Sequence, residues 1–316
     1  MAKHILDFPQ NDEELHDMLN EHFYKHYDTE HFLNKSMLLA GNIQHTEDIK
    51  KIVNSPLQFK KLKIDSPDID AKWLVRYSKQ EIVINYYHAA ESLLRLVIAH
   101  AEFPECPWHG ILQLNSSEEF RKRLKEINDG TYFFDGQRKA LEQLFYIHRK
   151  AFPKLSDEEW EENLDGLENI FNHIASSVGT AADYNVFKHG GTLFSTELGL
   201  SINNLQLAEK QEAFMFLGYS RDKLENYIET KTFRVVKFLR WEEKIAETYL
   251  TTQLMQNLFE AKRLRLGIGK DAKLHSFKGV DVMKILLGGE KSQIVTTDMK
   301  FPLTTYREAR VKKEKS

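Results

Sequence analysis

The chain has 316 residues, of which 41% are hydrophobic and 29% are charged, and glycine (15) and proline (7) are scarce. This composition is typical of a helix-rich globular protein and excludes a disordered chain. The formal net charge of -3 excludes a large, uniformly basic nucleic-acid surface. Because Cys106 is the single cysteine, an internal disulfide and a cysteine-only zinc site are excluded, and we expect a reducing compartment, the cytoplasm.

Membrane association is not expected from the sequence. The N-terminus turns acidic before any apolar run could serve as a signal peptide, and no stretch reaches the length of a membrane span.

Helix signals dominate the first 190 residues. Ser66 followed by Pro67 predicts a helix start, and the segment from there to Pro104 is expected to form one long helix or two nearly collinear ones. Because that segment is apolar on most faces, we expect it to be central. Two later helix starts are predicted from Ser-x-x-Glu capping boxes, Ser116 with Glu119 and Ser156 with Glu159.

The pattern changes after residue 190. Alternation at 198–202 and the runs "AFMFLGY" and "TKTFRVVKFLRW" predict the strands of a small antiparallel sheet. A helix is expected to resume near Trp241 and to end in "KRLRLGIGK", where glycine suits helix termination. The last fifty or so residues are expected to be irregular, with candidate strands at "SQIVTT".

These elements predict a mainly α fold, a helical bundle with a small inserted antiparallel β-sheet, α+β overall. Its parts are a helical domain at 1–190, the inserted sheet at 191–240, and a long helix with an irregular basic C-terminal region at 241–316, packed together as one domain.

Three polar residues interrupt the apolar central helix. His88, Glu91 and Arg95 follow one another at spacings of three and four residues, which places them on one helix face. A buried arginine keeps its charge and needs a partner. Two interpretations follow: Glu91 and Arg95 form an internal pair, or they form the wall of an anion-binding or catalytic cleft.

A second polar cluster lies in "DYNVFKHGG", residues 183–191. Asn185 and His189 are four residues apart and would share a helix face, with Lys188 beside them. The alternative is an ordinary helix C-terminus, in which cations face the negative end of the helix dipole and Gly190 ends the helix.

Together the two clusters resemble the HEPN superfamily, compact helical-bundle proteins of prokaryotic defence and toxin systems. Its motif is an arginine, four to six further residues and a histidine, usually with a polar residue after the arginine. "RLVIAH" matches this spacing through Arg95 and His100, although Leu96 is apolar. "YNVFKHG" is similar to the family's RNxxxH form through Asn185 and His189, although a tyrosine replaces the arginine.

The resemblance implies metal-independent RNA cleavage, in which a histidine moves protons and an arginine steadies the phosphate. The expected catalytic residues are Arg95, His100 and His189. The expected substrate-binding residues are His88, Glu91, Tyr184, Asn185 and Lys188.

Neither a metal nor another cofactor is expected. His22, His26 and His31 gather near the N-terminus, but no full ligand set accompanies them, and a solvated helix face is the preferred interpretation. Four basic clusters, "FKKLK", "RKRLK", "AKRLRL" and "VKKEK", would form an RNA-facing stripe if the fold brought them together, and otherwise are scattered solvated faces.

The sequence therefore leaves two hypotheses. In the first, the chain is an RNA-binding or metal-independent RNA-cleaving protein of bacterial stress or phage defence. In the second, it is a non-enzymatic helical interaction or regulatory module with no catalytic site. The expected partners are RNA, a partner protein or a second copy of the chain, as in family members whose site spans a dimer.

Overall fold

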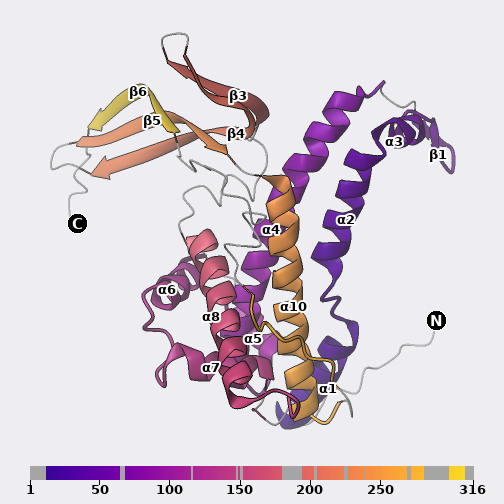
Figure 1. Ribbon diagram of the computed structural model, residues 1–316, viewed down its shortest axis with the longest axis vertical. Coiled ribbons are helices and arrows are strands. Elements are labelled where there is room, and N and C mark those ends of the chain that lie inside the picture. The colour runs from indigo at the N-terminus through magenta and orange to yellow at the C-terminus, as the bar shows by residue number, and fades with distance from the viewer. Residues whose placement is uncertain are drawn as a thin grey trace, which may run out of the picture. The chain divides into compact units, whose positions relative to one another are not determined.

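The computed structural model of the protein confirms a mainly helical fold with an antiparallel sheet (Figure 1). The structure describes residues 12–64, 68–114, 117–146, 149, 152–179, 194–202, 205–223, 227–238, 240–268, 272–280 and 299–309. The helices are α1 (Asp12–His26), α2 (His31–Gln44), α3 (Thr46–Val53), α4 (Ala71–Glu102), α5 (Pro107–Gln113), α6 (Ser117–Asn128), α7 (Gln137–Tyr146), α8 (Asp157–Gly179) and α10 (Trp241–Arg265). The strands are β1 (Leu57–Phe59), β2 (Leu62–Ile64), β3 (Phe194–Ile202), β4 (Leu205–Lys223), β5 (Tyr227–Phe238) and β6 (Met299–Ala309).

The chain divides into two compact units. Unit 1 consists of Met1–Asn34, His88–Thr180 and Ala246–Glu290. Unit 2 consists of Lys35–Tyr87, Ala181–Ile245 and Lys291–Ser316. Helices α2, α4 and α10 each contribute residues to both units.

Unit 1 is a helical bundle in which α8 packs against α6 and α7, while α1 packs against α5. The predicted apolar stripe of α8 is buried, as expected for an amphipathic helix. Its members are Leu164, Leu167, Ile170, Phe171 and Ile174. The half of α4 in this unit is also buried, through Leu93, Leu94, Val97 and Ile98.

Local signals explain where the long helices begin and end. The predicted capping box of α8 is present: the Ser156 backbone NH donates to Glu159 Oε2 at 2.8 Å, and the Glu159 NH donates to Ser156 Oγ at 3.2 Å. Helix α4 is continuous over 32 residues. Asp70 caps it by accepting the Lys72 NH at 3.0 Å, while the predicted start at residues 66 and 67 lies outside the described residues.

The segment 272–280 is held against α8 and α10 by two buried asparagines. Asn257 accepts the His275 backbone NH at 2.7 Å and donates to the His275 carbonyl at 2.8 Å. Asn163 accepts the Phe277 backbone NH at 2.6 Å. Gly166 lies so close to Phe277 that an added Cβ would clash with the Phe277 carbonyl oxygen.

Unit 2 contains a four-stranded antiparallel sheet in the order β3-β4-β5-β6. The strands predicted in the inserted region are present as β3, β4 and β5. Strand β6 was not predicted. It pairs with β5 from Val236 opposite Met299 to Tyr227 opposite Ala309, while "SQIVTT" lies outside the described residues. Pro302 is tolerated in β6 because this is an edge strand and the register shifts there.

Unit 2 also contains a short hairpin that the sequence analysis did not predict. Strand β1 pairs with β2 from Leu57 opposite Ile64 to Phe59 opposite Leu62. Lys60 in its turn has a φ of 54°, a left-handed conformation. In the described ranges, no helix is both long and apolar enough to cross a bilayer.

Candidate functional site

Arg95, the first predicted catalytic residue, is engaged inside unit 1. Its Nε lies 2.7 Å and its Nη2 2.6 Å from Glu91 Oε1, and Nη1 donates to the Leu114 carbonyl oxygen. The guanidinium carbon lies 4.2 Å from the centre of the Phe120 ring, in a cation–π contact. The side chains of Arg95 and Glu91 are only 19% and 8% exposed. This arrangement is the internal pair, the first of the two interpretations of these residues.

His88 lies one turn before Glu91 on α4. It is partly exposed and has an interaction partner in the protein.

His100, the second predicted catalytic residue, uses both ring nitrogens within unit 1. Nδ1 donates to the Leu96 carbonyl at 2.7 Å, and Nε2 accepts the Tyr24 hydroxyl at 2.8 Å. Burial lowers the pKa of His100 to about 3, the nearby cations Lys262 and Arg265 add to this effect, and the bond to Leu96 opposes it.

These contacts give His100 a neutral ring with one fixed tautomer at neutral pH. A general base needs an available nitrogen and a pKa near the working pH, and His100 has neither in this arrangement. Its geometry is that of a buried structural histidine. The second predicted cluster, with Tyr184, Asn185, Lys188 and His189, lies outside the described residues.

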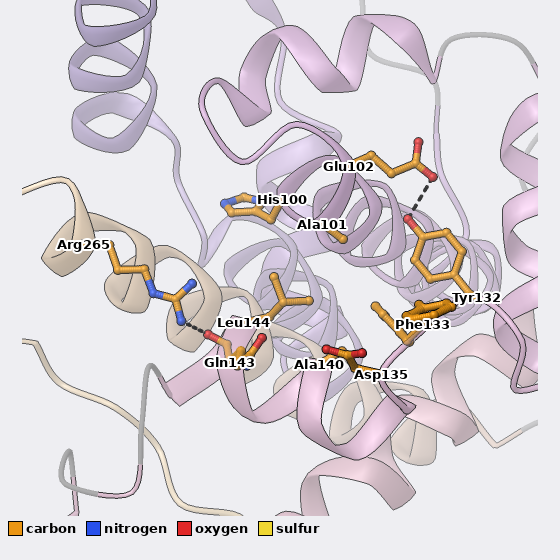
Figure 2. Close-up of a pocket in the computed structure, with 11 residues that line it drawn as sticks. His100, Ala101, Glu102, Tyr132, Phe133, Asp135, Ala140, Gln143, Leu144 and Arg265 are labelled. Carbon is orange, nitrogen blue, oxygen red and sulfur yellow. Dashed lines mark hydrogen bonds between the residues drawn. The ribbon is translucent and has the colours of Figure 1, made fainter.

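His100 nonetheless borders a pocket of about 480 Å³ in unit 1, which we call the aromatic pocket (Figure 2). It lies between the end of α4, the loop before α7, α7 itself and the end of α10. Its polar and aromatic lining residues are His100, Glu102, Tyr132, Phe133, Phe134, Asp135, Gln143 and Arg265. His88, Glu91 and Arg95 are not among its lining residues.

Two side chains of the aromatic pocket are available for a ligand. Phe134 is fully exposed, at 102% of its reference area, although its ring is apolar. Arg265 extends from the end of α10 and donates to the Gln143 backbone carbonyl (Figure 2). Burial lowers the pKa of Arg265, but a guanidinium remains charged in proteins. The pocket therefore combines an exposed ring with a fixed positive charge.

The carboxylates of the aromatic pocket are already paired. Glu102 Oε1 accepts Arg123 Nε at 2.5 Å and the Tyr132 hydroxyl at 3.0 Å. Asp135 Oδ2 lies 3.4 Å from Lys139 Nζ. Because both acids have cationic partners, they offset little of the positive charge that Arg265 presents to an anionic ligand.

Two of the four basic clusters meet at this pocket. Arg123 of "RKRLK" is bonded to the lining residue Glu102, and Arg265 of "AKRLRL" lines the pocket itself. "FKKLK" belongs to unit 2, and "VKKEK" lies outside the described residues.

Comparisons with protein-family models, curated proteins and solved structures gave no match to this chain. Within the part of the chain that the structure describes, no group of three histidine, cysteine, aspartate or glutamate side chains could hold a metal ion.

Phe134 and Arg265 were not among the site residues expected from the sequence. The signal for Phe134 is a run of three aromatic residues, "TYFF", between Gly130 and Gly136, which both have positive φ angles of 69° and 92°. Aromatic residues concentrated in a turn have little core to fill and so point to a binding surface. Arg265 lies in a recognised basic cluster, but its neighbour in space could not be read from the sequence.

Proposed function

We propose that this chain binds single-stranded RNA in the aromatic pocket and that the segment from Arg95 to His100 has a structural role. The observation that carries the proposal is the fully exposed Phe134 ring in the same pocket as Arg265. Proteins commonly recognise unpaired bases by stacking them on aromatic rings and hold the backbone with arginine.

The size and charge of the pocket support this proposal. A volume of about 480 Å³ lies within the range of ordinary ligand sites and accommodates one flipped-out nucleotide. Arg265 of the last turn of α10 lines the pocket, and the basic cluster "RKRLK" reaches it through Arg123, which is bonded to the lining residue Glu102. We expect the RNA backbone to follow this basic side, with one base on Phe134.

The resemblance to the HEPN superfamily supports RNA over other nucleic acids and suggests stress or phage defence in the bacterial cytoplasm as the setting. The internal pairing of Arg95 and the two bonds of His100 favour a binding role over catalysis by these two residues.

The test is fluorescence anisotropy of a labelled single-stranded RNA of about ten nucleotides with the full chain. Phe134→Ala is expected to weaken binding about tenfold or more, because stacking of a base on an aromatic ring contributes roughly 1–3 kcal/mol. Trp73→Ala is the matched control, since Trp73 is 63% exposed on α4 and does not line the pocket. RNA binding that is unaffected by Phe134→Ala, or the absence of RNA binding, contradicts the proposal.

A further inference from the structure

A second cleft, of about 760 Å³, lies in unit 1, and we call it the α1–α10 cleft. Its walls are the end of α1, the turn into α2, the middle and end of α10, and the segment 272–275. It shares no lining residue with the aromatic pocket. A ligand bound in the α1–α10 cleft would therefore occupy a site separate from the aromatic pocket.

Two buried polar atoms of the lining residues have no hydrogen-bond partner among the described residues. Thr252 is 2% exposed, and its Oγ1 is unsatisfied. Arg263 pairs with Glu260 through Nη1 at 2.7 Å, but its Nε is buried and unsatisfied. A buried polar group without a partner destabilises a fold by about 1–3 kcal/mol, so such groups indicate a missing ligand group.

Aromatic rings and amides are among the lining residues of this cleft. Tyr27 and Phe259 are stacked with ring centres 4.7 Å apart, and Tyr249 is 48% exposed. Gln253 donates to the Tyr249 hydroxyl at 2.8 Å, and Gln256 donates to Glu30 Oε1 at 2.9 Å.

These two donations orient the amides. Within the described ranges, the carbonyl oxygens of Gln253 and Gln256 accept no hydrogen bond, since the bonds of both residues run through their nitrogen atoms. The lining of the cleft therefore offers aromatic rings together with two carbonyl acceptors, which suits a planar ring that carries amino groups.

The segment 272–275 adds a positively charged side chain, Lys273, to the lining of the cleft. Lys273 is exposed and forms no hydrogen bond or ion pair with any described residue. Of the two acids that line the cleft, Glu260 pairs with Arg263, and Glu30 accepts a hydrogen bond from the neutral Gln256 amide and keeps its negative charge. The other cations of the cleft are paired, Lys25 with Glu21 at 2.5 Å and Arg263 with Glu260 at 2.7 Å, so Lys273 is the cation that an anionic group in the cleft would meet.

We propose that the α1–α10 cleft binds a nucleoside monophosphate. The base stacks on Tyr249 and donates its amino group to the glutamine carbonyls, the Thr252 hydroxyl bonds to the ring or the ribose, and Lys273 pairs with the phosphate. This site is separate from RNA binding at the aromatic pocket and does not depend on it.

Isothermal titration of the full chain with AMP, UMP and adenosine tests the proposal. AMP is expected to bind with a Kd below about 100 µM. UMP is expected to bind about fivefold or more weakly, because uracil has no exocyclic amino group for the glutamine carbonyls. Adenosine is expected to bind about tenfold more weakly than AMP, because it has no phosphate for Lys273.

Three variants locate the site. Lys273→Ala is expected to weaken AMP binding about tenfold and to leave adenosine binding unchanged. Lys278→Ala is its matched control, because Lys278 lies in the same segment, pairs with Glu159 at 2.5 Å and does not line the cleft. Thr252→Val, which is nearly isosteric, is expected to weaken AMP binding about fivefold.

Folding and binding are separated by one further measurement. Because Thr252→Val removes an unsatisfied hydroxyl, the thermal midpoint of the nucleotide-free variant is expected to be unchanged or raised. Phe134→Ala is expected to leave AMP binding intact. The proposal is overturned if AMP does not bind at about 1 mM, or if Lys278→Ala weakens binding as much as Lys273→Ala does.

Discussion

The Tyr24 hydroxyl and His100 Nε2 are joined by a buried hydrogen bond of 2.8 Å, between residues of α1 and α4 that are 76 positions apart in the chain. The bond fixes the tautomer of a histidine that burial keeps neutral. His100 thereby contributes to the fold of unit 1 as a neutral ring that connects two helices.

The neutrality of His100 makes the stability of the protein depend on pH. The folded-state pKa of about 3 is below the ordinary value of 6.5, so the unfolded chain binds the proton more readily. Stability is expected to fall as the pH drops below 6.5 and to keep falling toward pH 3. At pH 5 the free energy of unfolding is expected to have fallen by about 2 kcal/mol through this histidine.

Urea denaturation at pH 7 and pH 5 measures this effect. His100→Gln is expected to lose about 2 kcal/mol less than the wild type between the two pH values. Tyr24→Phe removes the hydroxyl but leaves the burial, so it is expected to keep most of the pH dependence. An identical pH dependence in His100→Gln and the wild type would show that the ring is not buried in solution.

The pair of Glu91 and Arg95 is expected to be structural. Glu91→Gln leaves the Arg95 charge in a mostly buried position, so we expect a loss of about 3 kcal/mol in the free energy of unfolding. The double variant Glu91→Gln with Arg95→Met is expected to be more stable than the single variant, because it buries no unmatched charge. A double variant that is stable but has lost RNA binding would instead assign the pair to a ligand site.

Gly166 is expected to tolerate no side chain. A Cβ at this position would clash with the backbone carbonyl of Phe277. Because a backbone carbonyl cannot move aside as a flexible side chain can, Gly166→Ala is expected to lower the free energy of unfolding by about 2 kcal/mol or more. Gly41→Ala is the matched control. Gly41 is also in a helix, nothing lies within 4 Å of an added Cβ, and alanine there is expected to stabilise by about 0.5–1 kcal/mol. Thermal unfolding of both variants gives the comparison.

Arg265 and Phe134, which both line the aromatic pocket, are expected to affect RNA binding in different ways. Arg265→Ala removes about one phosphate contact, so the slope of log affinity against log salt concentration is expected to become shallower by about 0.7. Phe134→Ala is expected to weaken binding without a change in slope, because stacking releases no counterions. Equal slopes in Arg265→Ala and the wild type would exclude a phosphate contact at this residue.

Incubation of labelled total RNA with the purified chain in EDTA tests cleavage. His100→Gln is expected to leave any metal-independent cleavage intact, because both ring nitrogens of His100 are bonded within the fold. Loss of cleavage in His189→Ala would support the resemblance to the HEPN superfamily and assign the base to the second motif. Loss in folded His100→Gln would contradict the structural role of His100.

Much of the helical fold could be predicted because its signals are local. The Ser156 and Glu159 box, the apolar stripe of α8 and the glycine after α10 all lie within a few residues of the structure that they specify. Strands β3 to β5 could also be predicted. Their pairing is between strands that follow one another in the chain, and each strand has a local residue pattern typical of a strand.

Features that depend on distant partners could not be predicted in the same way. Strand β6 pairs with β5 across more than sixty residues of chain, from Met299 to Val236, and no local pattern specifies that pairing. The aromatic pocket likewise brings Phe134 together with Arg265, and the spacing of His100 after Arg95 gave no sign that Tyr24 covers it. Spacing within one helix predicts a shared face but not what packs against it.

Asn257 and Asn163 bind segment 272–280 through hydrogen bonds and make this irregular stretch part of the cooperative core. Asn257 bonds both backbone groups of His275, as a neighbouring strand would, and Asn163 bonds the amide of Phe277. The segment can therefore detach only when α8 and α10 give up buried hydrogen bonds, and the amide hydrogens of His275 and Phe277 should exchange with solvent as slowly as those of the helices. A wall of the α1–α10 cleft is thus built from a loop with the rigidity of secondary structure, and a ligand there would meet a preformed surface.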